Sequence, residues 1–175
     1  MSEITISTFS GEELASHVGE LSALLHACVH AGASIGFVLP HSEAESQAFW
    51  LGNVLPAVAG GARLMLVARS DNRIVGSVQL DHDTMPNQPH RAEVRKLLVH
   101  PRFRRRGIAK LLMAELERHA SRIGRSLLTL DTRTGDAAEP LYASLGYQTT
   151  GVIPGYCLNP FEPRLDPTTI MYKAL

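Results

Sequence analysis

The stretch HPRFRRRGIAKLLM, residues 100–113, places four arginines within five positions and then passes through one glycine into an apolar run. Its apolar residues recur at helical spacing, which predicts a helix over 107–121. No Ser, Thr, Asp or Asn stands at the start of this helix, so its first backbone amides lack a side-chain cap. Uncapped amides beside arginines favour an anion, and a phosphate or pyrophosphate would satisfy them.

The positive charge around this turn is local. Between residues 91 and 110 the chain has eight lysines and arginines but one acidic residue, Glu93, whereas the net charge of the whole chain is zero. A neutral protein has no overall field that draws it to nucleic acid or to membranes. From the residues alone two interpretations stay open, an anion-binding helix start or a solvated basic turn that touches nucleic acid.

The chain on either side of this stretch alternates strands and helices. Ser10 with Glu13 and Ser42 with Glu45 form capping-box signatures, which predict helices that end near residues 29 and 60. Pro56 is expected to kink or shorten the second of these helices. The remaining predictions are strands at 3–8, 63–69, 74–80, 92–100, 126–132, within 147–157 and at 168–175, and a helix at 136–146. Hairpins in the first half and a β–α–β unit in the second predict one mixed α/β domain over residues 1–175.

Composition excludes several other classes of protein. Hydrophobic residues make up 45% of the 175 residues and charged residues 19%, which is an ordinary globular balance. No apolar run reaches the roughly 18 residues that span a bilayer, and the N-terminus does not resemble a signal peptide. The two cysteines, Cys28 and Cys157, are expected to be buried free thiols. His26 and His30 lack a third ligand at a recognisable spacing, so we predict no metal. The cysteines, the apolar runs and the N-terminus together favour a cytoplasmic protein.

The segment RRRGIA, residues 104–109, resembles the [QR]-x-x-G-x-[GA] pyrophosphate loop of the GNAT family of acyl-CoA-dependent N-acyltransferases. The order of elements is similar to that family over nearly the whole chain, and Tyr142 followed by Gly146-Tyr147 matches a second family motif. The resemblance implies the GNAT fold, with a mostly antiparallel, twisted central sheet that splays at the acyl-CoA strand and about four helices. It also implies acetyl-CoA as co-substrate and a small-molecule amine as acceptor, with monomers and homodimers both open.

The resemblance assigns the cofactor to one strand and to the loop after it. Backbone amides of about Arg105 to Lys110 would hold the pyrophosphate, and the strand would pair with the pantetheine arm. The Leu98 amide would polarise the thioester carbonyl. Arg105 stands where the family often has glycine, so the loop is expected to be tighter or to use the left-handed conformation less freely. The implied cofactor residues are Leu98, Val99, Arg104, Arg105, Arg106, Gly107, Ile108, Ala109 and Lys110.

The strand before the loop also carries a structural prediction of its own. In a flat strand neither face of the segment RAEVRKLLV, residues 91–99, is cleanly apolar. A break in the alternation, and therefore a β-bulge, is expected within it.

Acyl transfer to an amine requires a base, because a lysine-type amine with a pKa of about 10.4 is mostly charged at neutral pH. Glu93 and Asp131 are the candidate bases, and Tyr142 is the candidate acid for the leaving thiolate. Each has a structural alternative. Glu93 would pair with a neighbouring arginine, Asp131 would cap a turn, and Tyr142 would be a core aromatic. Cys157 has no adjacent basic residue, and direct transfer needs no acyl-enzyme.

The resemblance also implies that two glycine-bearing loops shape the acceptor pocket. Ser34 and Phe37 lie in the first loop, and Tyr156 follows the Pro-Gly turn of the second. The stretches GASIGF, RAEVRKLLV, LDT, LYASLGY and PGYC are similar to a branch of the family that acetylates an amino-acid-like toxin. A polyamine or a peptide amine stays open as acceptor, and a non-catalytic acyl-CoA sensor stays open as function. Nucleic acid is not expected as a partner, because the chain lacks an aromatic stacking platform.

Overall fold

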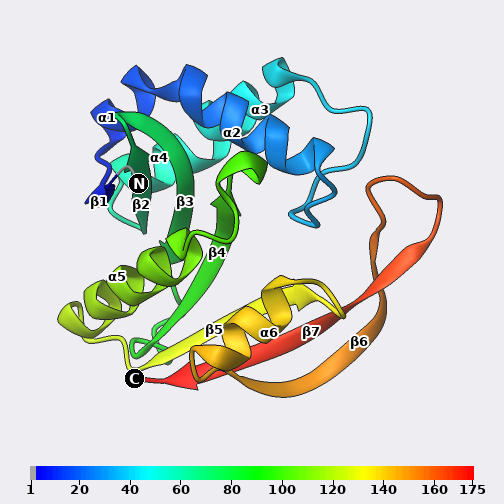
Figure 1. Cartoon of the computed structure of the whole chain (residues 1–175). Coiled ribbons are helices and arrows are strands. Elements are labelled where there is room, and N and C mark those ends of the chain that lie inside the picture. The colour runs from blue at the N-terminus through cyan, green and yellow to red at the C-terminus, as the bar shows by residue number, and fades with distance from the viewer. Residues whose placement is uncertain (1–2) are drawn as a thin grey trace.

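A seven-stranded sheet organises residues 3–175, the part of the chain that this computed structural model describes. Its strands are β1 (Ile4–Thr8), β2 (Arg63–Ser70), β3 (Arg73–Asp81), β4 (Arg91–Val99), β5 (Leu127–Arg133), β6 (Gln148–Leu158) and β7 (Leu165–Ala174). They lie in the order β1-β2-β3-β4-β5-β7-β6 (Figure 1). All neighbours pair antiparallel except β4 and β5, which are parallel and joined by a helix. The predicted α/β class and mostly antiparallel sheet are confirmed.

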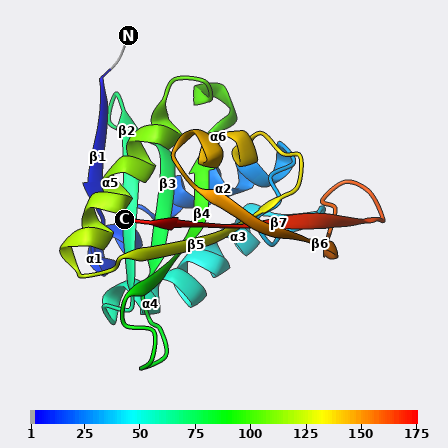
Figure 2. The same ribbon diagram turned by 90° about the horizontal axis from the view of Figure 1, so that it is seen from below.

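Helices cover both faces of this sheet (Figures 1 and 2). They are α1 (Gly11–Ser16), α2 (Val18–His30), α3 (Glu43–Phe49), α4 (Leu55–Ala59), α5 (Ile108–Arg122) and α6 (Ala138–Ser144). The apolar faces of α5 and α6 bury one hydrophobic cluster against the sheet, and those of α1, α2 and the π-helical turn after α3 bury a second. The basic turn therefore leads into a helix whose apolar stripe is packed, as its spacing predicts.

The described residues hold six α-helices rather than the expected four, because two predicted helices are each broken once. The first breaks at His17, whose backbone leaves the helical region and whose Nδ1 lies 2.8 Å from the carbonyl oxygen of Glu13. The second passes through a π-helical turn, Trp50–Val54, before α4 begins with Pro56 in its first turn. Proline lacks an amide and crowds the preceding turn, so it is tolerated where a new helical segment starts.

The two parallel strands pair only at their beginning. Arg91–Glu93 of β4 lie opposite Leu127–Thr129 of β5, and beyond that point the strands diverge (Figure 1). Within β4 the register against β3 shifts, so that Lys96 and Leu97 together oppose Val78. Lys96 has a φ of 52°, in the left-handed region. The predicted bulge is therefore confirmed, and it lies beside the gap between β4 and β5.

Gly76 of β3 brings α5 close to the sheet. A Cβ at this position would lie 2.9 Å from the carbonyl oxygen of Leu98 and 3.1 Å from Cγ2 of Ile108. The first of these atoms is backbone and cannot rotate away. We expect Gly76→Ala to lower the free energy of unfolding by about 1–3 kcal/mol through overpacking.

Urea denaturation of the two proteins checks this expectation. Gly19→Ala is the matched control, since a Cβ at this exposed position of α2 meets no atom within 4 Å. This control should leave stability unchanged or raise it, because alanine favours the helix. A Gly76→Ala protein as stable as the wild type would contradict the close packing of α5.

Candidate active site

A cavity of about 950 Å³ opens where β4 and β5 diverge. Its wall combines the loop after α2, the bulged half of β4, the start of α5, and parts of β5, α6 and β6. Most of the predicted site residues line it, although they come from distant parts of the sequence. These residues are Ser34, Glu93, Leu98, Val99, Arg104, Arg105, Gly107, Ile108, Ala109, Lys110, Asp131, Tyr142 and Tyr156.

Two predicted residues lie outside the cavity wall. Phe37 packs edge-on against Phe49, with ring centroids 5.2 Å apart, and belongs to the core beneath the loop. Arg106 lies with its guanidinium 4.9 Å from the ring centroid of Phe103. Both side chains pack against an aromatic ring and do not face the gap. The position of a residue in a loop does not predict this contact.

The start of α5 leaves backbone donors free. Gly107 is the N-cap, has a φ of 78° and supplies no side-chain cap. Among residues 3–175, no protein acceptor takes the amides of Ile108, Ala109 or Lys110. Arg105 has a φ of 64°, so it adopts the left-handed conformation although it is not glycine. The expectation that this arginine uses the left-handed conformation less freely is therefore wrong, and the uncapped amides fit a pyrophosphate.

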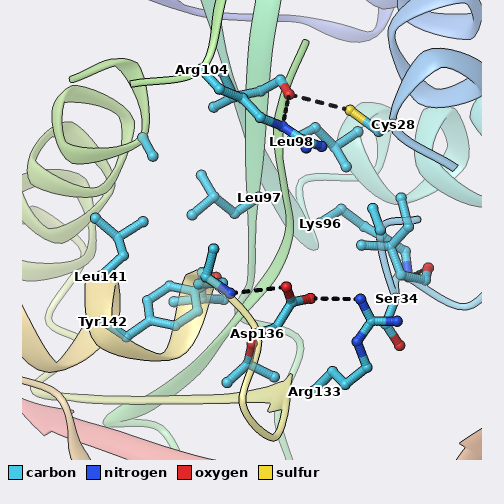
Figure 3. A pocket seen from close by; sticks show the side chains of 18 of the residues that line it. Cys28, Ser34, Lys96, Leu97, Leu98, Arg104, Arg133, Asp136, Leu141 and Tyr142 are labelled. Atoms are coloured by element: carbon cyan, nitrogen blue, oxygen red, sulfur yellow. Dashed lines mark hydrogen bonds and ion pairs between the residues drawn. The ribbon is translucent and has the colours of Figure 1, made fainter. Parts of the chain in front are cut away.

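Of the two predicted cofactor residues in β4, Leu98 and Val99, only Val99 turns its backbone toward the gap. The carbonyl oxygen of Val99 accepts hydrogen bonds from Cys28 Sγ at 3.5 Å and Arg104 Nε at 3.4 Å (Figure 3). The carbonyl of Leu98 instead approaches Gly76 of β3. Because the N–H and C=O of one strand residue point to the same side, the Val99 amide faces the gap and the Leu98 amide faces β3. The expectation that the Leu98 amide polarises the thioester carbonyl is therefore wrong, because this amide does not face the gap.

Cys28 is buried in this wall, whereas Cys157 is only half-buried, contrary to expectation. Burial raises the pKa of the Cys28 thiol to about 11, so it stays protonated at neutral pH. Cys157 Sγ lies 3.5 Å from Ser34 Oγ, which joins β6 to the loop after α2. Both thiols therefore act as wall groups here.

The two candidate bases have different surroundings. Glu93 pairs with Arg95 at 3.2 Å, and Arg95 also contacts Asp81 at 3.3 Å. Asp131 is exposed and forms no ion pair with the described residues, and its Oδ2 accepts a hydrogen bond from Thr168 at 3.3 Å. The ion-pair alternative for Glu93 is thus realised, whereas the Asp131 carboxylate lines the cavity without an ion-pair partner among the described residues.

Tyr142 belongs both to the core and to the cavity wall. It is 6% exposed, and its ring meets that of Tyr147 edge-on with centroids 5.7 Å apart. Its hydroxyl makes no hydrogen bond with the residues that the structure describes. Burial, and then the charge of Asp131, hold the pKa of Tyr142 above its ordinary value. The hydroxyl therefore keeps its proton across the physiological range.

Two cations in the wall were missed by the sequence reasoning. Arg133 Nη2 donates to the carbonyl oxygen of Gly32 at 3.0 Å and to Asp136 Oδ2 at 3.1 Å, so it ties the loop after α2 to the start of α6 (Figure 3). Lys96 Nζ donates to the carbonyl oxygen of Ile35 at 2.6 Å. The available signal for Lys96 was a charged residue within a strand that is expected to contain a bulge.

The splayed sheet and the uncapped helix beside it define a class of folds that receives a phosphate-bearing ligand between two parallel strands. Residues 42–153, more than half of the chain, match the family model described as an acetyltransferase (GNAT) domain. The chain belongs to the GNAT acetyltransferase family.

Relatives and solved structures agree with this membership. An acetyltransferase of Pectobacterium atrosepticum is 38% identical over 91 residues, which span 51% of this chain and 61% of the relative. A GNAT acetyltransferase structure from Streptococcus pneumoniae superposes with a TM-score of 0.78 at 20% identity, covering 99% of this chain and all of the other. The Salmonella typhimurium protein yncA, solved with its cofactor acetyl-CoA, has a TM-score of 0.76 at 18% identity over 98% of this chain and 94% of its own. Within residues 3–175, no helix has the length and apolar character needed to cross a bilayer.

Proposed function

We propose that this protein transfers the acetyl group of acetyl-CoA directly to a primary amine of a small molecule. The observation that carries the proposal is one cavity lined both by the uncapped start of α5 and by Glu93, Asp131 and Tyr142. Cofactor-binding donors and groups able to transfer protons in one space support a reaction between the two ligands. A non-catalytic acyl-CoA sensor has no need for the second set.

The cofactor end of the cavity suits coenzyme A. The amides of Ile108, Ala109 and Lys110 would hold the pyrophosphate, and Arg104 and Arg105 lie beside them. The backbone of Val99, which faces the gap, would pair with the pantetheine arm as a neighbouring strand does. Acetyl-CoA, when bound there, supplies the acetyl group as an activated thioester.

The chemical groups divide into a base and an acid. We assign the proton of the attacking amine to Asp131, because Glu93 is already engaged by Arg95. Tyr142 donates its hydroxyl proton in a hydrogen bond to the leaving sulfur. Glu93 then contributes negative charge that attracts a cationic amine into the cavity.

For the acceptor we propose an amino-acid-like toxin or antibiotic, in line with the likeness to the tabtoxin-resistance acetyltransferases. Support comes from Ser34 and Tyr156, which line the cavity from the loop after α2 and from β6. Both cysteines are free thiols, which supports a reducing, cytoplasmic location. A polyamine or a peptide terminus would be the acceptor if the panel below selects it.

The test is a panel of primary amines assayed with the purified full chain, with free thiol release as the readout. We expect at least one small amine to release thiol from acetyl-CoA in equal amount to N-acetylated product. Acetyl-CoA binding by calorimetry without thiol release from any amine would replace the enzyme with a sensor. Absence of acetyl-CoA binding would overturn the proposal altogether.

A further inference from the structure

We call the part of the cavity away from α5 and the turn before it the acceptor half. Three cationic side chains line this half: Arg95, Lys96 and Arg133. Two of them already have carboxylate partners within the chain. Arg95 contacts Glu93 and Asp81, and Arg133 contacts Asp136 at 3.1 Å and Asp166 at 3.7 Å. Lys96 forms no ion pair with any carboxylate of residues 3–175. It is therefore the cation of this half of the cavity whose charge has no counter-ion.

The surroundings of Lys96 make that lack of a partner costly. Its Nζ donates one hydrogen bond, to the carbonyl oxygen of Ile35, and lies 5.8 Å and 5.7 Å from the ring centroids of Phe37 and Phe49. Burial lowers the pKa of this ammonium group. An ammonium has three donors, so two remain for another acceptor. A largely desolvated cation is stabilised most by an anion placed against it.

The Lys96 side chain lies on the side of the cavity that we assign to the acceptor. Figure 3 places Lys96 on the side of β4 that faces the loop carrying Ser34, whereas Leu97 faces Leu141 and Tyr142. Consecutive side chains of a strand point to opposite sides, and the bulge at Lys96 and Leu97 changes the direction in which both point. The charge of Asp131 also acts on Lys96, so the two groups share one region of the cavity.

We infer that Lys96 binds a carboxylate of the acceptor, so that the acceptor is a zwitterion whose amine faces Asp131 and whose carboxylate faces the Lys96 ammonium. This inference rests on the proposed acetyl transfer and narrows its substrate to amino acids and their analogues. It accounts for a region of the cavity in which Asp131 and Lys96 have no ion-pair partner, whereas Arg95 and Arg133 do. A polyamine leaves the Lys96 charge unmatched.

A purely structural role for Lys96 is the competing interpretation. Its hydrogen bond to Ile35 fastens the loop after α2 to β4, and Gly36 permits the close approach, since a Cβ there would lie 3.4 Å from Nζ. Holding the loop after α2 against β4, which we call the fastening role, requires a hydrogen-bond donor at position 96 but not a positive charge. Glutamine keeps a donor and removes the charge, and arginine keeps both, so these two variants separate the interpretations.

The experiment compares amino acids with their carboxamides as acceptors, for example lysine with lysinamide and threonine with threoninamide, by kcat/KM from thiol release. We expect the wild type to favour the acid over the amide by about tenfold or more. Lys96→Gln should remove this preference by lowering kcat/KM for the acid while that for the amide changes by less than about threefold. Lys96→Arg should restore part of the preference.

The outcomes separate the inference from the proposed function. Equal losses for acid and amide in Lys96→Gln would overturn the inference and leave a fastening role, as would a wild-type protein that favours amides or polyamines. In both cases thiol release still supports acetyl transfer. No thiol release from any amine in the wild type would overturn the proposed function and the inference together. Thermal unfolding of each variant shows whether it folds. If Lys96→Gln does not fold, the preference of the wild type for the acid over the amide still tests the inference.

Discussion

Replacing Tyr142 with phenylalanine is expected to lower kcat by about 100-fold or more and to leave the Kd for acetyl-CoA within about twofold. The change removes one hydroxyl from a side chain that is 6% exposed and otherwise packed in the core. The ring, and with it the shape of the cavity, stays in place. The loss should therefore appear in turnover and not in cofactor binding.

The raised pKa of Tyr142 specifies how this hydroxyl acts. A thiol has a reference pKa of about 8.5, well below that of the buried phenol, so full proton transfer to the leaving sulfur is uphill. The hydroxyl instead stabilises the developing negative charge through a hydrogen bond. A cationic amine loses two protons on acetylation, of which Asp131 takes one and passes it to solvent and the leaving thiolate takes the other. Because burial favours the neutral phenol, Tyr142 should cause no alkaline loss of activity below about pH 10.

Tyr147→Phe provides the matched control. Tyr147 is 3% exposed, meets the ring of Tyr142 and does not line the cavity. Steady-state kinetics should show wild-type turnover in this variant and the large loss only in Tyr142→Phe. Equal turnover in both variants would return Tyr142 to the role of a core aromatic.

The order of elements and the basic helix start could be predicted from the sequence because both depend on local patterns. Capping boxes at Ser10 and Ser42, and the uncapped start at Gly107, are decided by residues within a few positions of each other. The bulge in β4 was also predictable, because neither face of residues 91–99 would be cleanly apolar in a flat strand. These predictions needed no knowledge of distant contacts.

Predictions that depended on distant partners were less accurate. Phe37 faces Phe49 of α3 and not the gap. Arg106 is a local exception, because the turn brings its guanidinium to Phe103 only three positions earlier. Which amide of β4 faces the gap depends on the pairing of Leu98 with Ser77, and therefore on the register set by the bulge. The unpaired charge of Lys96 appears only once every other cation of the acceptor half has its carboxylate in place.

We expect Asp131→Asn to lower kcat by about 100-fold or more at neutral pH, and Glu93→Gln to lower it by less. Asparagine keeps the size of the side chain and can still accept the hydrogen bond from Thr168, which spans 3.3 Å, but it cannot take a proton from the amine. Glu93 shares its charge with Arg95, so its replacement mainly weakens the attraction for a cationic acceptor. That loss should appear in KM more than in kcat.

The pH dependence of the Asp131→Asn enzyme separates a missing base from a damaged site. Without a base, only the neutral fraction of the amine reacts, and for an amine with a pKa of about 10.4 that fraction rises about tenfold per pH unit between pH 7 and 9. The residual rate of this variant should rise by the same factor, while its affinity for acetyl-CoA stays unchanged. A flat residual rate, or a larger kcat loss in Glu93→Gln, would move the base from Asp131 to Glu93. The reason would then be that the Arg95 pair opens when the acceptor binds, which frees the Glu93 carboxylate for the proton.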